Sequence, residues 1–211
     1  MKEPMLFNTK ILPVLVALIY LCSFHVAADY ATELVAKTKP SLTDKNCEAV
    51  ERQWVKPNSL TEDITEQRFT LLGRAKFSVL FWDIYESSLS TADGQRPFSH
   101  LCQELLFEIH YLRDISKKDL LDNTVSQWQH LSLKESEYSA FLPLLESIWQ
   151  DIKKGDRLSM LTQQNKTVFY LNREHIGEIE SSTFAKTFLG IWIDENTSEP
   201  KLRLKLLGDN V

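Results

Sequence analysis

The sequence predicts an α+β fold, because strand-like and helix-like patterns occupy separate stretches of one chain. Residues 69–82 are rich in aromatic and β-branched side chains, which is the composition of strands. Residues 120–152 instead place apolar side chains at steps of three and four, the period of amphipathic helices. Only six glycines serve 211 residues, and no stretch is rich in Pro, Gly or Ser, so we expect one domain without a linker.

The first expected elements are two strands at residues 69–73 and 76–82, with a bend near Gly73. A third strand is expected at residues 104–111, where apolar and polar side chains alternate. This period of two is typical of a strand with one buried face, and Leu106 breaks it. The buried face would carry Leu105, Phe107, Ile109 and Tyr111.

Two helices are expected next, at residues 120–131 and 138–152. The second has the more regular spacing of apolar positions. These positions are Tyr138, Phe141, Leu142, Leu145, Ile148, Trp149 and Ile152. Gly155 lies just past this helix, where glycine commonly ends a helix.

The C-terminal part is expected to return to strands and to close with two helices. Residues 158–162 and 167–171 are interpreted as a hairpin, and residues 174–179 as a further strand. A helix at residues 184–192 would stack its apolar side chains on one face. The last helix is expected to begin near Pro200, because proline suits the first helical turn.

The first 28 residues have the three-part layout of a cleavable secretory signal peptide. The basic start carries Lys2 and Lys10, an uncharged run covers residues 11–24, and small residues follow at 26–28. The uncharged run is shorter than the roughly 20 residues that a membrane span needs. We therefore expect cleavage near Ala28 and a periplasmic or secreted mature protein, with an uncleaved anchor as the alternative.

These patterns divide the chain into a signal peptide at 1–28, a polar N-terminal edge segment at 29–65 and one domain at 66–208. Removal of residues 1–28 takes away two of 24 basic and one of 29 acidic side chains, which leaves 22 against 28 and a net charge of −6. An acidic protein without a cluster of Lys and Arg is not expected to bind nucleic acid or to use a polybasic membrane contact.

Cysteine usage predicts a disulfide in the mature protein. Cleavage would remove Cys22 and leave Cys47 and Cys102. In an oxidising compartment an even pair favours one disulfide bond. Two unpaired buried thiols are the alternative.

No familiar catalytic or cofactor-binding signature occurs in the sequence. It has no G-x-S-x-G elbow, phosphate loop, G-x-G-x-x-G or H-E-x-x-H motif. The four histidines after the signal peptide, at 100, 110, 130 and 175, lack the spacing of metal ligands. We therefore expect neither a metal nor a cofactor.

Residues 72–89 resemble the glycine-to-tyrosine signature of chalcone-isomerase-like proteins. The segment reads Leu72-Gly73-Arg74-Ala75-Lys76-Phe77-Ser78-Val79-Leu80-Phe81-Trp82-Asp83-Ile84-Tyr85-Glu86-Ser87-Ser88-Leu89. Later pieces are similar to the bacterial exported branch and come in the expected order: Pro97-Phe98, Tyr111 to Ile115, Gly155-Asp156, Gly177, Phe184-Ala185, Ile191 to Ile193, Leu202-Arg203 and Leu206-Leu207. The resemblance spans residues 68–207. It implies an antiparallel sheet with helices packed on one face and a ligand cleft between them.

The resemblance points to enzymes in which a tyrosine, an asparagine and threonines surround the substrate and an arginine promotes the reaction. Matching along the chain places one threonine on Leu80, the later threonine and its neighbour on Ile191 and Trp192, and the tyrosine near Leu120. Leucine and isoleucine cannot donate hydrogen bonds to a developing anion. The resemblance therefore favours a protein without catalytic activity.

Non-catalytic relatives of this fold bind fatty acids, with an arginine holding the carboxylate. An arginine–carboxylate contact is charge-assisted and often bidentate. The position of this arginine falls on Arg68 by one alignment and on Phe77 by another, which leaves Arg74 as a neighbouring substitute. A plain surface charge is the alternative for Arg68.

The sequence thus predicts an exported, non-catalytic chalcone-isomerase-like protein that binds a small apolar ligand, such as a fatty acid or similar carboxylate. The candidate ligand-binding residues are Arg68, Arg74, Tyr85, Tyr111 and Arg113. One alternative is an intramolecular lyase of the chalcone-isomerase type that uses a rearranged polar set from the same residues. Another is a module that binds a second envelope protein through its surface.

Overall fold

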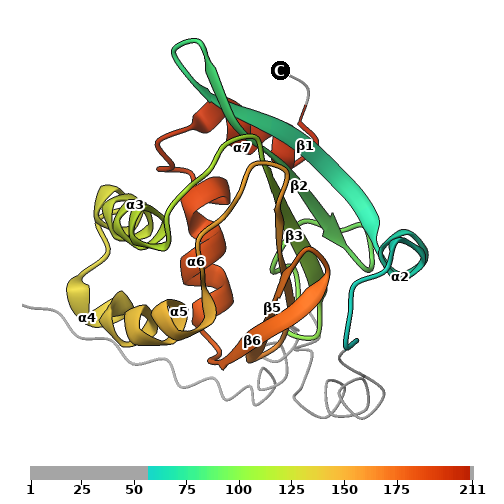
Figure 1. Cartoon of the computed structure of the whole chain (residues 1–211). Coiled ribbons are helices and arrows are strands. Elements are labelled where there is room, and N and C mark those ends of the chain that lie inside the picture. Colours follow the sequence, from blue (N-terminus) through green and yellow to red (C-terminus); the bar gives the residue numbers. More distant parts are fainter. Residues whose placement is uncertain (1–56, 210–211) are drawn as a thin grey trace, which may run out of the picture. The chain divides into compact units, whose positions relative to one another are not determined.

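The computed structural model describes residues 57–209, which form one antiparallel sheet with helices packed against it (Figure 1). The six strands follow one another in chain order across the sheet. They are β1 (Thr70–Val79), β2 (Trp82–Thr91), β3 (Glu104–Tyr111), β4 (Arg157–Gln163), β5 (Lys166–Leu171) and β6 (Glu174–Glu180). The predicted α+β class, with an antiparallel sheet, is confirmed.

The two strands predicted at 69–73 and 76–82 are one strand, β1. The bend expected near Gly73 remains as a register shift between Leu71 and Gly73. The chain reverses at Leu80 and Phe81, and β2 then pairs with β1. The prediction missed this turn because Leu-Phe carries none of the glycine, asparagine or aspartate signals of a two-residue hairpin.

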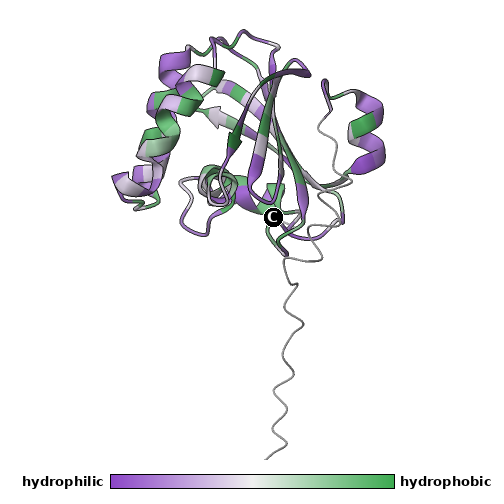
Figure 2. Ribbon diagram, turned by 90° about the horizontal axis from the view of Figure 1, so that it is seen from below, coloured by the Kyte–Doolittle hydropathy of each residue, from purple (hydrophilic) through white to green (hydrophobic). Residues whose placement is uncertain are grey.

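The helices are α2 (Glu62–Arg68), α3 (Lys117–His130), α4 (Glu135–Tyr138), the 3₁₀ turn η1 (Ser139–Phe141), α5 (Leu142–Ile148), α6 (Phe184–Ile193) and α7 (Pro200–Leu206). Ser116 caps α3, since its side chain accepts a hydrogen bond from the Asp119 backbone N–H. Pro200 begins α7 as expected. Figure 2 shows hydrophilic and hydrophobic residues on the same helices, as one-sided packing requires.

The single helix predicted at residues 138–152 is divided into α4, η1 and α5, and it ends earlier. Pro143 lies in the first turn of α5, where its missing N–H is tolerated but where a continuous helix would need that donor. After Ile148 the chain is extended, and Ile152 pairs with Ile115. Gly155, with a φ of 95°, therefore serves a turn before β4 rather than a helix end.

The main hydrophobic core lies between the helices and one face of the sheet. In Figure 1, α3, α5 and α6 lie on the same side of the sheet. Phe169 of β5 packs edge-on against Phe184 and Phe188 of α6. At the β1 edge, α7 approaches so closely that a β-carbon on Gly73 would lie 1.9 Å from the carbonyl oxygen of Lys205. Only glycine fits this contact.

A second, smaller cluster covers the opposite face of the sheet. It consists of Leu60, Phe69, Leu106, Leu161, Val168 and Tyr170. The Tyr170 hydroxyl donates to the carbonyl oxygen of Pro57 at 2.8 Å. Leu106, which broke the alternation of its strand, is buried in this cluster. The boundary predicted between residues 65 and 66 falls inside α2.

Several predictions concern residues outside the described part of the chain. The signal peptide and Cys47 lie there. Cys102 is described and is disulfide-bonded, while Cys47, its predicted partner, lies outside the described residues. Within residues 57–209, no helix is both long and apolar enough to cross a bilayer. No group of three potential metal ligands occurs in that range either.

Candidate functional site

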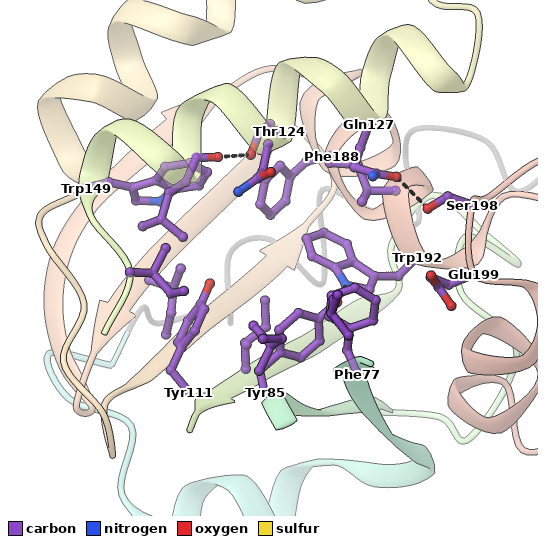
Figure 3. Close-up of a pocket in the computed structure, with 18 residues that line it drawn as sticks. Phe77, Tyr85, Tyr111, Thr124, Gln127, Trp149, Phe188, Trp192, Ser198 and Glu199 are labelled. Carbon is purple, nitrogen blue, oxygen red and sulfur yellow. Dashed lines mark hydrogen bonds between the residues drawn. The ribbon is translucent and has the colours of Figure 1, made fainter. Parts of the chain in front are cut away.

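A cavity of about 410 Å³ lies between the sheet and the helices (Figure 3). Strands β1 to β4 form one wall, and α3, α6 and the segment before α7 form the other. Its volume falls within the range of about 300–1,000 Å³ that is usual for small-molecule sites. Apolar and aromatic side chains dominate its lining.

A row of three aromatic rings crosses neighbouring strands and forms the sheet side of the cavity. Phe77 of β1 is paired with Tyr85 of β2, and Tyr85 is paired with Tyr111 of β3. The ring centroids are 5.2 Å apart for the first pair and 6.1 Å apart for the second. Because facing residues of adjacent strands point to the same side, strand register alone brings these rings together.

The helix side of the cavity faces this row. In Figure 3, Trp149, Thr124 and Phe188 lie across the open space from Tyr111 and Tyr85. The Thr124 hydroxyl donates to the carbonyl oxygen of Leu120 at 2.8 Å, within its own helix. Its proton is therefore already engaged.

Several side chains offer neutral hydrogen-bond donors to the cavity: the amides of Asn123 and Gln127 line it, and three aromatic side chains present N–H or O–H groups. The Trp149 indole Nε1 is buried and has no hydrogen-bond partner among the described residues. The Tyr111 hydroxyl points from its strand toward the helices. Among the described residues it has no hydrogen-bond partner. The Tyr85 hydroxyl accepts a hydrogen bond from Trp192 Nε1 at 2.9 Å, so its own proton remains to be donated.

Both phenols are protonated at neutral pH, and burial extends this state to higher pH by raising the pKa of each. Burial raises the pKa of Tyr85 to about 12, a shift that the Trp192 hydrogen bond partly opposes and the charge of Glu199 adds to. Burial also raises the pKa of Tyr111 above its ordinary value. Removing a phenol from water disfavours its charged form, so each hydroxyl remains a donor.

Alkaline conditions are expected to destabilise the fold through these two phenols. Their folded-state pKa values lie above the unfolded value of 10.0, so this contribution is intact below pH 10 and declines as pH rises toward 12. Urea unfolding at increasing pH should show a smaller decline for Tyr111→Phe than for the unmodified protein. Equal declines would show that Tyr111 ionises as easily in the folded state as in the unfolded state.

The described lining of the cavity contains no Lys, Arg or His. Glu199, beside the start of α7, is the charged residue that contributes to it. The cavity therefore has the apolar surface and the neutral donors of a binding site, but no cation for a carboxylate.

The structure brings together two of the five candidate ligand-binding residues. Tyr85 and Tyr111 line the cavity. Arg68 forms a two-pronged ion pair with Glu104, with distances of 2.5 and 2.6 Å, beside the second hydrophobic cluster. Arg113 lies over the Trp82 ring, 4.2 Å from its centroid, and is not part of the lining.

Arg74 lies in a polar groove of about 450 Å³ on the opposite face of the sheet. Glu86, His110 and Arg157 share this groove. The alternation along β1 explains its position, because Ala75 and Phe77 face the main core and Arg74 must then face away. The same alternation, applied to the sequence, would have excluded Arg74 from the core side.

The positions matched to enzyme side chains fall in two places. Leu120, Ile191 and Trp192 line the cavity with mainly apolar surface. Leu80 instead lies in the β1–β2 turn, with 87% of its surface exposed. Trp149 was assigned to the core from its helical spacing, and its unpartnered indole nitrogen had no signal in the sequence.

Comparison with known proteins agrees with this architecture. The family model described as chalcone isomerase-like matches residues 52–208. An uncharacterized protein of Haemophilus influenzae is 21% identical over 137 residues, which are 65% of this chain and 67% of that protein. The crystal structure of a fatty-acid binding protein of Arabidopsis thaliana superposes with a TM-score of 0.54 at 13% identity, over 74% of this chain and 92% of that one. The chain belongs to the chalcone isomerase-like family.

Proposed function

We propose that this protein is exported and binds a small, mainly apolar ligand, of which a fatty acid is an example, without transforming it. The observation that carries this proposal is the aromatic-lined cavity of about 410 Å³ between sheet and helices. Burial of apolar ligand surface there would supply the main favourable free energy. The solved structure of similar fold that belongs to a fatty-acid binding protein supports the same class of ligand.

The lining supports a ligand whose polar end is an uncharged acceptor. Trp149 Nε1 and the hydroxyls of Tyr111 and Tyr85 are neutral donors, and no described lining residue is a cation. An unpaired carboxylate in such a site would lose its hydration without compensation. A fatty acid would therefore bind in its protonated form, and an ester or alcohol of equal length would bind at least as well.

The same lining argues against catalysis of the chalcone-isomerase type. Ile191 and Leu120 occupy positions that the resemblance matches to hydroxyl-bearing side chains. These two positions therefore cannot supply the oxyanion stabilisation that the matched hydroxyls would give. A chalcone incubated with the protein should lose its absorbance no faster than in buffer, and faster loss would contradict the non-catalytic proposal.

Two observations support export. The N-terminal sequence has the layout of a signal peptide, and Cys102 is disulfide-bonded. Disulfides persist mainly in oxidising compartments such as the periplasm. N-terminal sequencing of the protein recovered from its source should find a start near Asp29.

Ligand binding can be tested with cis-parinaric acid, a fluorescent fatty acid, and with its methyl ester. We expect the ester to bind with similar affinity at neutral and mildly acidic pH, whereas the acid should bind more tightly at acidic pH, where it is neutral. Native mass spectrometry of protein purified without detergent should show the bound probe. Spectra that remain those of the free protein with both probes would contradict the binding proposal.

The Glu199→Gln variant serves as the control for this pH dependence. Glu199 is the charged residue of the described lining, and its negative charge would repel an anionic ligand. If the ligand carboxyl is responsible, the variant should retain the preference for acidic pH. Tighter binding of the acid at higher pH would contradict the proposal that the cavity binds a ligand with an uncharged polar end.

A further inference from the structure

The turn between β1 and β2 presents apolar side chains to solvent. Leu80 and Phe81 form this turn, with 87% and 97% of their surfaces exposed. Trp82, the next residue, is 56% exposed, and Val79, the last residue of β1, is 47% exposed. We call residues 79–82 the apolar tip. In Figure 1 this end of the hairpin extends past α3 and α7.

Neither the backbone conformation of the turn nor its exposure to water favours the residue types found in the apolar tip. Leu80 has a φ of 54°, in the left-handed region that glycine adopts without cost. Two-residue hairpin turns favour glycine, asparagine or aspartate for this reason. Leu80 is therefore unfavourable for the turn, and both Leu80 and Phe81 are unfavourable for exposure to water. Such a local conflict is expected where the side chains serve an interaction.

The apolar tip is continuous with the cavity. Val79 belongs to both, and Ile84 and Phe77 extend the cavity lining along the same two strands. An apolar surface therefore leads from Phe81, outside the fold, to the aromatic row inside it. A mainly apolar ligand has low solubility in water and accumulates in membranes, so a path of this kind suits a tip that meets a lipid phase.

The side chains around the apolar tip suit a bilayer surface. The Arg113 guanidinium lies over the Trp82 ring, and tryptophan with a neighbouring cation is typical of the interface between headgroups and acyl chains. Below the tip, Lys76 and Asp83 form an ion pair at 3.1 Å. The uncharged part is thus limited to the turn itself, which would insert only shallowly.

We propose that the apolar tip docks on the surface of a lipid bilayer and that the ligand passes between bilayer and cavity along it. The attraction is hydrophobic rather than electrostatic, because the mature chain has a net charge of −6. The docking of the tip does not depend on the proposed ligand-binding function. Only the passage of ligand rests on that function.

The test is flotation of the purified mature protein with phosphatidylcholine vesicles. The protein should float with the vesicles and should remain bound in high salt. The decisive variant is Leu80→Gly with Phe81→Ser, because Gly-Ser is a favoured two-residue turn and preserves the hairpin while removing the apolar tip. We expect its vesicle affinity to be at least about tenfold lower.

Leu144→Ser is the matched control. It removes an apolar side chain that is 43% exposed on α5, away from the hairpin in Figure 1, and should float like the unmodified protein. The tip variant should still bind soluble methyl parinarate, which separates docking from ligand binding. Failure of the unmodified protein to float, or equal flotation of the tip variant, would overturn the proposal. So would stable capture of a protein through the tip in the absence of vesicle binding.

Discussion

Replacing Thr124 by tryptophan is expected to weaken ligand binding by about two orders of magnitude. Thr124 is buried on α3 and faces the open space of the cavity, so the indole would occupy volume that the ligand needs. Loss of roughly 100 Å² of apolar contact corresponds to about 2.5 kcal/mol, or roughly 60-fold in affinity. Titration of both proteins with methyl parinarate would measure this loss of affinity.

The control for this prediction is Ser126→Trp, two residues along the same helix. Ser126 is exposed and is not among the cavity-lining residues, so the same large side chain would point away from the ligand. We expect this variant to bind like the unmodified protein. If both variants bind methyl parinarate normally, the cavity is not the ligand site.

Replacing Gly73 by alanine is expected to lower the free energy of unfolding by at least about 3 kcal/mol. The added β-carbon would lie 1.9 Å from the Lys205 carbonyl oxygen and 2.8 Å from that of Leu206. Both contacts are to backbone atoms, so no side-chain rotation relieves them. α7 would have to move from β1 and expose Leu202 and Leu206, which are now buried. Urea unfolding followed by circular dichroism would measure the loss.

Gly190→Ala is the matched substitution for this measurement. Gly190 lies in α6, and the nearest atom to an added β-carbon is Leu131 Cδ1 at 3.7 Å, an ordinary contact. Since alanine favours helix by about 1 kcal/mol over glycine, stability should stay equal or rise. Unchanged stability of Gly73→Ala would indicate that the close approach of α7 to β1 is not maintained in solution.

The periodicity of the chain was sufficient to predict most of the sheet and its layers. Alternation between residues 104 and 111 placed Phe107, Ile109 and Tyr111 on the core face, where the structure has them. The β1–β2 turn could not be predicted, because Leu80 and Phe81 carry an apolar pattern that reads as continuous strand. Turns are predicted from residues such as glycine and asparagine, which suit the backbone conformation of a turn. The β1–β2 turn has neither of these residues at its two positions.

The candidate site was only partly predictable. Tyr85 and Tyr111 were identified from the sequence, and they meet because β2 and β3 pair in a register that aligns them. Arg68 and Arg74 were selected by alignment to an arginine of the family. Glu104 pairs with Arg68, and strand alternation turns Arg74 to the opposite face, so neither lines the cavity.

The sequence by itself determined the α+β class, the resemblance to chalcone-isomerase-like proteins and the acidic charge, because these depend on local periodicity and composition. Only the tertiary structure decided the chemistry of the cavity. Which side chains share one enclosed space depends on strand register and helix packing between residues far apart in the chain. Trp149 and Tyr111 come from different elements, and only their packing makes the cavity one of neutral donors without a cation.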